Sequence, residues 1–250
     1  NLYKMPKLMT KMRKAGFSIL FIGIESVNRN SLLETAKVQN IGALEEAVTT
    51  IHSYGFIIAP GLIFGFDSDT KTVFQDTLRF IRETGTIGGD PSFLTALAGT
   101  PLYARMKKSG RLIERREGAI ERKKIMTNIR YLQDKDFLAR GFLQFVKEFT
   151  KPAFQYARLH NHIALIINNP HFIPIEDSGY ASPFPYLKRQ IKNRSYISML
   201  FGRIFYLSRP DRLWTVCKAW FLIKKYSRRA SHLSTHFFYW LYVWTNMALK

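Results

Sequence analysis

Continuous apolar runs alternate with amphipathic stretches over the first hundred residues of the chain. The runs "FSILFIGI" (17–24) and "FIIAPGLIFGFD" (56–67) are bounded by glycine or a carboxylate, which is typical of strands buried on both faces. "DPSFLTALAG" (90–99) is predicted as a third strand. Residues 7–15, 40–55 and 69–85 carry apolar side chains at helical spacing and each ends at a glycine, so they are predicted as helices.

This alternation of strand and helix predicts an α/β fold with a parallel sheet and helices outside it. Ligands of such folds bind at the carboxyl ends of the strands, in barrels and in open sheets alike. Three strand ends therefore become candidate site positions: residues 23–26, 61–69 and 97–103.

The pattern changes after about residue 105. A charged connector comes first, residues 134–160 are predicted to be helical, and residues 168–186 are rich in turn-forming proline. From residue 187 onward, basic and aromatic residues interleave and further helices are expected. We therefore divide the chain into residues 1–105, a helical extension over 106–160, and a basic, aromatic-rich and mainly helical region over 161–250.

Charge and cysteine content limit the kinds of partner and of site that the chain can have. The 250 residues carry a net charge of +20, which favours an anionic partner. The single cysteine, Cys217, excludes an internal disulfide framework and any multi-cysteine metal site, and a reducing, cytoplasmic setting is the simplest interpretation. No apolar run reaches the 18 residues that suggest a membrane-spanning helix. The chain opens within a predicted helix, which is typical of a piece of a longer protein.

Glu25 is the most informative residue at a strand end. A carboxylate that follows an apolar strand needs a hydrogen-bonding partner. Either Glu25 or Ser26 caps the next turn, or Glu25 contacts a ligand that offers hydroxyls or an ammonium. Asp67 and Asp69 are interpreted as turn and N-cap residues, and "TPLY" as a helix start with Pro101 at its first position.

Two other features are given structural interpretations. "HNH" (160–162) places two histidines on one side of a strand but not of a helix, and no carboxylate or cysteine cluster stands nearby, so a metal site is not favoured. Cys217 lies among tryptophans and valine and is interpreted as a small packing residue. No phosphate-binding loop, nucleophile elbow or dinucleotide fingerprint is present.

Several motifs taken together resemble the second half of a radical S-adenosylmethionine (radical SAM) enzyme barrel. They are closest to the cobalamin-associated branch that includes hopanoid and lipid methylases. "FIGIES" resembles the fourth barrel strand, "AKVQN" the start of the next helix, and "GLIFGFDSDT" the fifth strand. "LTALAGTPLYARMKKSGRL" resembles the sixth strand and its sequel, with Ala98 where the family usually has proline. "TNI" (127–129) and "FTKPAFQYARL" (149–159) resemble the helical extension. The resemblance covers residues 7–160.

The resemblance implies a partial (β/α) barrel of about three βα units followed by a mainly helical C-terminal region. It also implies a mechanism in which a [4Fe–4S] cluster cleaves SAM and a radical modifies or methylates the substrate, which could be lipid-like. Glu25 and Ser26 would then contact SAM. Lys37, Gln39 and Asn40 would either offer donors to its carboxylate or merely begin the next helix, and the backbone at Leu97 would flank its adenine. Cobalamin would bind to a domain outside this chain.

The chain departs from that family in lacking the cluster motif. A cluster of this kind needs three cysteines, and the first three barrel strands are absent as well. We therefore expect no turnover by this chain alone, an exposed edge on the strand over 17–24, and the N-terminal half of the same enzyme as its partner. The alternative is a non-catalytic basic module. An upstream in-frame C-x-x-x-C-x-x-C would favour the enzyme.

The basic segment carries its own prediction. Between Pro183 and Ala230 the only acid is Asp211, and the basic residues are Lys188, Arg189, Lys192, Arg194, Arg203, Arg209, Arg212, Lys218, Lys224, Lys225, Arg228 and Arg229. With the interleaved aromatic residues, this composition indicates either a solvated face or peripheral attachment to an anionic membrane. Nucleic acid is the lesser option, because the aromatics are spaced as on a helix face.

Overall fold

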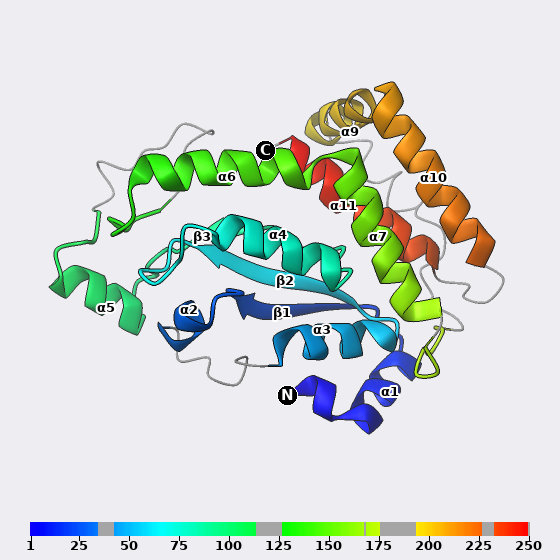
Figure 1. The fold of residues 1–250 in the computed structure, drawn as a ribbon, viewed down its shortest axis with the longest axis horizontal. Coiled ribbons are helices and arrows are strands. Elements are labelled where there is room, and N and C mark those ends of the chain that lie inside the picture. Colours follow the sequence, from blue (N-terminus) through cyan, green and yellow to red (C-terminus); the bar gives the residue numbers. More distant parts are fainter. Residues whose placement is uncertain (35–42, 114–126, 168, 176–193, 227–232, 250) are drawn as a thin grey trace.

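A computed structural model describes residues 1–34, 43–113, 127–167, 169–175, 194–226 and 233–249 (Figure 1). The first part holds the sheet: η1 (Leu2–Lys4), α1 (Pro6–Lys14), β1 (Ile19–Glu25), α2 (Arg29–Glu34), α3 (Leu44–Ser53), β2 (Ile57–Phe64), α4 (Val73–Glu83), β3 (Ser92–Phe93) and α5 (Pro101–Lys108). The second part is helical: α6 (Lys135–Phe149), α7 (Pro152–Ile167), α9 (Arg194–Leu207), α10 (Pro210–Tyr226) and α11 (Leu233–Ala248).

The three strands form one parallel sheet in the order β1-β2-β3. Ile19 lies opposite Ile57, and the register runs evenly until an irregularity between Gly23 and Glu25. The prediction of a mixed α/β fold with a parallel sheet is therefore confirmed. Three consecutive parallel strands are common to an open sheet and to part of a barrel, so the sheet alone does not distinguish the two.

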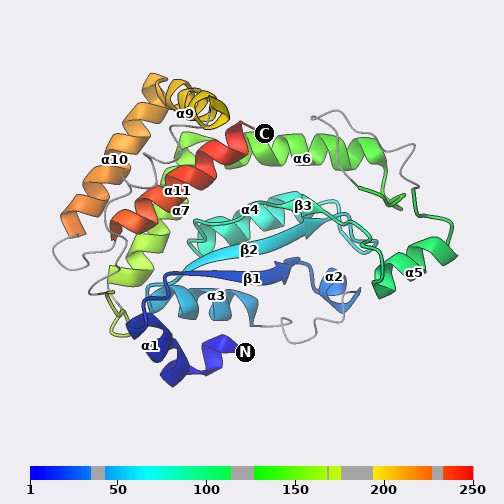
Figure 2. The same cartoon turned by 180° about the vertical axis from the view of Figure 1, so that it is seen from behind.

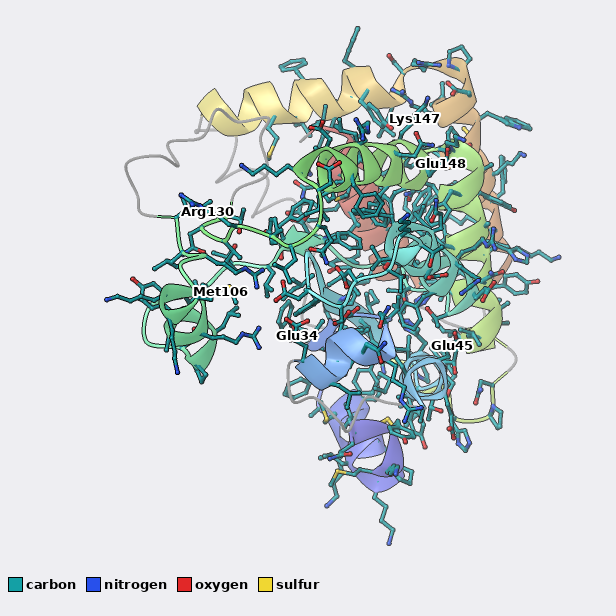
Figure 3. All side chains as sticks on the ribbon, turned by 60° about the vertical axis from the view of Figure 1, so that its left-hand side comes forward. Glu34, Glu45, Met106, Arg130, Lys147 and Glu148 are labelled. Atoms are coloured by element: carbon teal, nitrogen blue, oxygen red, sulfur yellow. The ribbon has the colours of Figure 1, made fainter. Side chains whose placement is uncertain are left out.

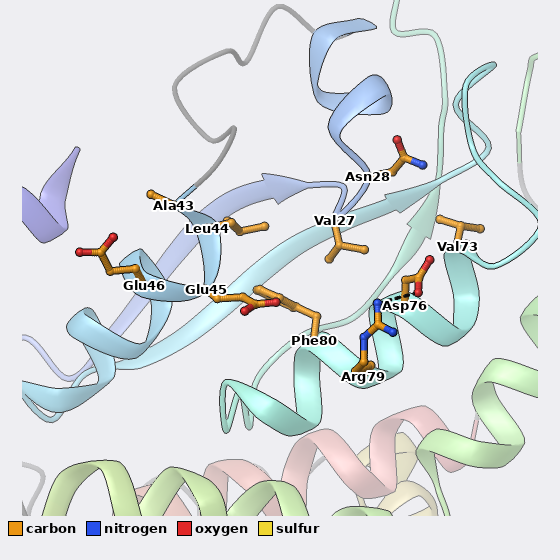
Figure 4. Close-up of a pocket in the computed structure, with 10 residues that line it drawn as sticks. All are labelled: Val27, Asn28, Ala43, Leu44, Glu45, Glu46, Val73, Asp76, Arg79 and Phe80. Carbon is orange, nitrogen blue, oxygen red and sulfur yellow. Dashed lines mark hydrogen bonds and ion pairs between the residues drawn. The ribbon is translucent and has the colours of Figure 1, made fainter.

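The two faces of the sheet are covered differently. Apolar side chains at Ile24, Ile58 and Phe64 pack into a core with α3 and α4, which lie over this face (Figure 4). Alternate residues of the strands point to the other face, because side chains alternate along a strand. That second face meets α11 through Val243.

The prediction that the first strand is buried on both faces is wrong. Phe21 is 81% exposed and Ile19 is also exposed, whereas Ile24 on the covered face is buried. An uninterrupted apolar sequence cannot reveal how far a covering layer extends, and α11 covers this face only in part.

The third strand is shorter than predicted, with only Ser92–Phe93 in the sheet. Beyond it, the side-chain amide of Asn128 accepts from the backbone N of Ala96 at 2.8 Å and donates to its carbonyl at 2.7 Å. Thr127 and Tyr131 both donate to the carbonyl of Leu94 at 2.8 Å. Residues of the "TNI" motif thus replace a neighbouring strand, which explains why these backbone groups can be buried.

The predicted helices are present in the structure, but several begin or end at other residues than predicted. The helix predicted over 134–160 is divided into α6 and α7 at Pro152, which has no N–H and disfavours helix at the preceding residue. Helix α4 begins at Val73 with Thr72 at its N-cap, so the N-cap role predicted for Asp69 is wrong. Helix α5 begins as predicted: Thr100 is the N-cap and its hydroxyl accepts from the backbone N of Tyr103 at 3.2 Å.

The helical part builds a core of its own beside the sheet. Side chains of α7, α10 and α11, such as Ile163, Ala219 and Trp240, pack together with Ile57 and Ile87 from the sheet region. Figures 1 and 2 show α7, α10 and α11 at one end of the sheet, with α9 and α10 outermost. Within the part of the chain that the structure describes, no helix combines the length and apolar character needed to cross a bilayer.

Candidate functional site

A groove lies on the partly covered face of the sheet, between the strands and α11. Its volume is about 350 Å³. Its floor is strand backbone that includes Gly23, Gly61 and Gly89, and the Phe21 ring lies over Gly61, where a Cβ would meet it at 3.3 Å. Tyr239 and Tyr242 of α11 form part of the opposite wall. Such a combination of backbone floor and aromatic wall is typical of small-molecule sites.

Glu25 lines this groove at the end of β1. It is half-buried and has a φ of +67°, which makes it the one non-glycine residue with positive φ among the described residues. The left-handed backbone coincides with the register irregularity after Gly23. Left-handed backbone at a non-glycine residue costs about 1–3 kcal/mol and is concentrated at functional positions. The positive φ is thus a second reason, besides the sequence pattern, to take Glu25 as a candidate ligand-binding residue.

The polar groups that line the groove are acidic or neutral, although the guanidinium of Arg203 lies 4.7 Å from the ring centre of Tyr242, one of the lining residues. Asp90 and Glu25 supply carboxylates, Ser92 and the two tyrosines supply hydroxyls, and Asn246 supplies an amide. Among its described lining residues there is no lysine or arginine, although the chain as a whole has a net charge of +20. Burial raises the pKa of the Tyr239 phenol, which therefore stays protonated at neutral pH. Carboxylate acceptors together with hydroxyl and amide groups suit a ligand that carries a positive charge and hydroxyls.

The other predicted site residues lie elsewhere. Ser26 is buried and its hydroxyl accepts from the backbone N of Asn28 at 3.1 Å, so the capping interpretation applies to Ser26. Leu97 is 66% exposed, does not line the groove, and its carbonyl accepts from the Thr100 hydroxyl at 2.7 Å. Lys37, Gln39 and Asn40 lie outside the described residues.

Asp69 organises the turn that follows β2. Its carboxylate accepts from the backbone N of Gly65 at 2.8 Å and of Phe66 at 3.1 Å, and from the hydroxyl of Ser31 at 2.8 Å. Burial raises the pKa of this carboxyl group, and these hydrogen bonds oppose that rise. Asp69 thus has the structural turn role that the sequence indicated.

The remainder of the "GFDSDT" turn ties α2 and α5 together. Arg111 donates to both carboxylate oxygens of Asp67, at 2.7 and 2.6 Å. Ser68 donates to Glu34 at 2.9 Å, and Arg105 donates to the second oxygen of Glu34 at 3.1 Å (Figure 3 labels Glu34). These charged side chains are paired within the fold, so the turn has a structural role at the carboxyl end of the sheet.

A second cavity, of about 520 Å³, opens between α3 and α4 on the opposite face (Figure 4). Its charged residues include Glu45, Asp76 and Arg79, and the last two form an ion pair of 2.9 Å one turn apart on α4. An ion pair of this spacing is an ordinary feature of helix surfaces. We therefore assign the site to the groove that contains Glu25.

Three buried histidines meet in the core: His52 in the last turn of α3, His162 on α7 and His236 on α11. His162 Nε2 and His236 Nδ1 are 2.8 Å apart, and the ring of His52 meets that of His162 edge-on at 4.6 Å between centroids. His162 lies on α7, so the two histidines of "HNH" do not share a face: His162 is buried and His160 exposed. Among the described residues no group of histidines, cysteines and carboxylates has the geometry of a metal site.

Sequence reasoning missed the contribution of α11 to the groove. Tyr239, Tyr242, Val243 and Asn246 line it at spacings of three and four residues, while Trp240 and Trp244 of the same helix are fully buried on another side. A helix that is apolar nearly all round signals burial on two sides. Residues 233–248 have this apolar pattern, but the pattern does not show which element the second side of the helix would face.

Comparison with known proteins finds similarity to methylases over part of the chain. Residues 100–204 match a domain of unknown function (DUF4070). The chain is 34% identical to the hopanoid C-2 methylase of Rhodopseudomonas palustris over 114 residues, which are 45% of this chain and 22% of that protein. It is 32% identical to the bacteriochlorophyllide d C-12(1)-methyltransferase of Chlorobaculum tepidum over 108 residues, 43% of this chain and 24% of that protein.

An uncharacterized methyltransferase of Synechocystis is 32% identical over 124 residues, 49% of this chain and 23% of that protein. In each case the chain spans less than a quarter of the relative's length. The resemblance to the cobalamin-associated branch of the radical SAM methylases is thereby confirmed, for part of the chain. The domain match also extends past residue 160, beyond the range over which the motifs resembled that family.

Proposed function

We propose that this chain forms part of a radical SAM methyltransferase and that its groove holds the part of SAM that carries hydroxyls and positive charge. The observation that carries the proposal is the acidic, lysine-free and arginine-free lining of the groove among the described residues of a strongly basic chain. The sulfonium, the ammonium and the ribose hydroxyls of SAM match carboxylates and tyrosines. An anionic ligand would not match them.

Glu25 accepts hydrogen bonds from the ligand in this proposal. Its position at the end of β1 agrees with the rule that ligands bind at the carboxyl ends of parallel strands. The irregular backbone after Gly23 turns the carboxylate out of the regular strand pattern. Tyr239 and Tyr242 would cover the ligand from the side of α11 and exclude water.

A [4Fe–4S] cluster, when bound, supplies the electron that cleaves SAM. The described residues do not fit a cluster, because Cys217 is the only cysteine of the chain and lies on α10 as a free thiol. The cluster ligands and the cobalamin of this branch therefore belong, in the proposal, to other parts of the enzyme. The sheet would be the second half of a barrel that those parts complete.

The exposed second face of β1 supports this arrangement. Phe21, which is 81% exposed, lines the groove together with Glu25. In a closed barrel this face would be the interior, where a phenylalanine is buried. The partner of the chain is thus proposed to be the N-terminal half of the same enzyme, which would add the missing strands.

The test is the affinity of the full-length enzyme for SAM with Glu25→Gln. Loss of a charge-assisted hydrogen bond costs about 1.5–3 kcal/mol, which weakens binding by about tenfold to a hundredfold. Glu83→Gln, at an exposed end of α4, serves as the control and should leave the dissociation constant unchanged. Unaltered SAM affinity of folded Glu25→Gln protein would contradict the assigned role.

A further inference from the structure

The outer sides of α9 and α10 expose large apolar side chains. On α9 these are Phe201, Ile204 and Phe205, which share one side at spacings of three and four residues. On α10 they are Leu213, Trp214 and Phe221. Single exposed apolar residues are normal, but a concentration of this size on two consecutive helices marks an interaction surface. Both helices lie at the periphery of the molecule (Figures 1 and 2).

Lysines accompany these apolar side chains on α10. Trp214, Lys218, Phe221 and Lys225 follow one another at spacings of four, three and four residues, so they form a single exposed stripe. Lys218 Nζ lies 5.6 Å from the ring centre of Trp214, and Lys224 lies beside Lys225 at the end of the helix. We call these three lysines and the six apolar residues the α9–α10 surface.

The acidic residue beside this surface does not neutralise it. Asp211, at the start of α10, lies 3.4 Å from Arg209, so its charge is already balanced by that arginine. Residues 201–225, which include this surface, carry six basic residues and one acid, Asp211, so this segment has a net positive charge. A stripe that combines aromatic rings, aliphatic side chains and lysines matches the interfacial region of a bilayer, where rings sit at headgroup depth and cations meet anionic headgroups.

We propose that the α9–α10 surface binds an anionic lipid membrane peripherally. A second copy of this chain fits less well, because a twofold contact would bring like-charged lysines together. Nucleic acid fits less well because the aliphatic side chains of Ile204 and Leu213 lie exposed among the rings, and burying them gains more from lipid than from a polyanion. The inference rests on the exposed helices alone and is independent of the proposal for the groove.

The experiment measures co-sedimentation of the chain with two kinds of vesicle. One is phosphatidylcholine alone, and the other is phosphatidylcholine with about 30% phosphatidylserine, which is anionic. Binding is expected only to the anionic vesicles and should weaken at about 0.5 M salt, where screening is short-ranged. The triple variant Lys218→Gln, Lys224→Gln and Lys225→Gln should lose about fivefold in partitioning for each lysine. The pair Trp214→Ser and Phe221→Ser should lose at least about tenfold.

Matched controls lie on α6. Leu143 is as exposed as the aromatic residues of the surface, and Arg140 is exposed too, so Leu143→Ser and Arg140→Gln should bind as the unchanged chain does. All substitutions are at exposed positions, and equal thermal unfolding midpoints will show that each variant is folded. No binding, equal binding to both vesicles, or equal losses in the controls would overturn the proposal. Salt-sensitive binding to single-stranded DNA but not to vesicles would overturn it in favour of nucleic acid.

Discussion

The buried histidines predict that acid destabilises the fold well above the pH at which its carboxylates protonate. Burial lowers the pKa of His52 from 6.5 to about 4, and burial also lowers the pKa of His162 well below 6.5. The neighbouring His52 and His236 rings and Arg158 lower it further. The His52 ring is therefore neutral in the folded protein at pH 5, and the lowered pKa of His162 favours its neutral form as well, while both residues in the unfolded chain are largely protonated.

The sign and size of the effect follow from linkage. Below pH 6.5 the unfolded state binds more protons than the folded state, so the free energy of unfolding falls as the pH decreases toward the folded-state pKa. For His52, each pH unit between 6.5 and about 4 costs up to about 1.4 kcal/mol. At pH 5 this amounts to about 2 kcal/mol for His52, and His162 adds a loss of the same sign. The full stability is present above pH 6.5.

Urea unfolding of the chain at pH 7.5, 6.5, 5.5 and 5.0 measures this loss. His52→Gln should retain stability better than the unchanged chain as the pH falls, because one buried titrating ring is gone. His160→Gln is the matched control, since His160 is exposed on the same helix as His162. A free energy of unfolding that stays level between pH 7.5 and 5.0, or identical slopes for His52→Gln and the unchanged chain, would refute the reasoning.

Two further predictions concern backbone packing. Asn128→Leu should lower the free energy of unfolding, measured by urea titration, by about 2–4 kcal/mol, because the buried N–H and carbonyl of Ala96 both lose their partner. A loss below about 0.5 kcal/mol would contradict this and show that water replaces the amide. Gly85→Ala would place a methyl 2.6 Å from the backbone N of His162 at a φ of +63°. It should lower the thermal unfolding midpoint more than Gly110→Ala does, because Gly110 has a similar φ but open space around it. Equal midpoints for the two variants would contradict this.

The alternation of strands and helices could be predicted because it rests on local pattern. Periodicity located β1, β2, α3 and α4 to within a few residues, and Pro101 marked the start of α5. The end of the third strand could not be located in this way. Residues 94–96 look like strand in sequence, and the backbone N of Leu94 still donates to the carbonyl of Phe64 at 2.8 Å. The other partners of Leu94 and Ala96 are the side chains of Thr127, Asn128 and Tyr131, which lie 32 to 37 residues further along the chain.

The candidate site could be predicted only on the side of the sheet. Glu25 was identified because a carboxylate interrupts an apolar run, and that signal is local. The groove's other wall comes from Tyr239, Tyr242 and Asn246, more than two hundred residues away in sequence. Hydrophobic pattern showed that this segment is helical but not which side would face the sheet. Leu97 was selected by resemblance alone, and in the structure its carbonyl serves the turn before α5.

Helix α11 links the groove to the buried histidines. One side carries Tyr242 and Asn246 into the groove, and another carries Trp240 and Trp244 into the helical core. The indole N–H groups of these tryptophans donate to the carbonyls of Gln155 and Thr150, each at 3.0 Å, so the helix is fixed against α7 and the end of α6. His236, in the first turn of α11, lies in the histidine cluster. Loss of that cluster's packing would therefore loosen the anchoring of the helix that forms one wall of the groove, which makes the acid sensitivity of the core a property of the candidate site as well.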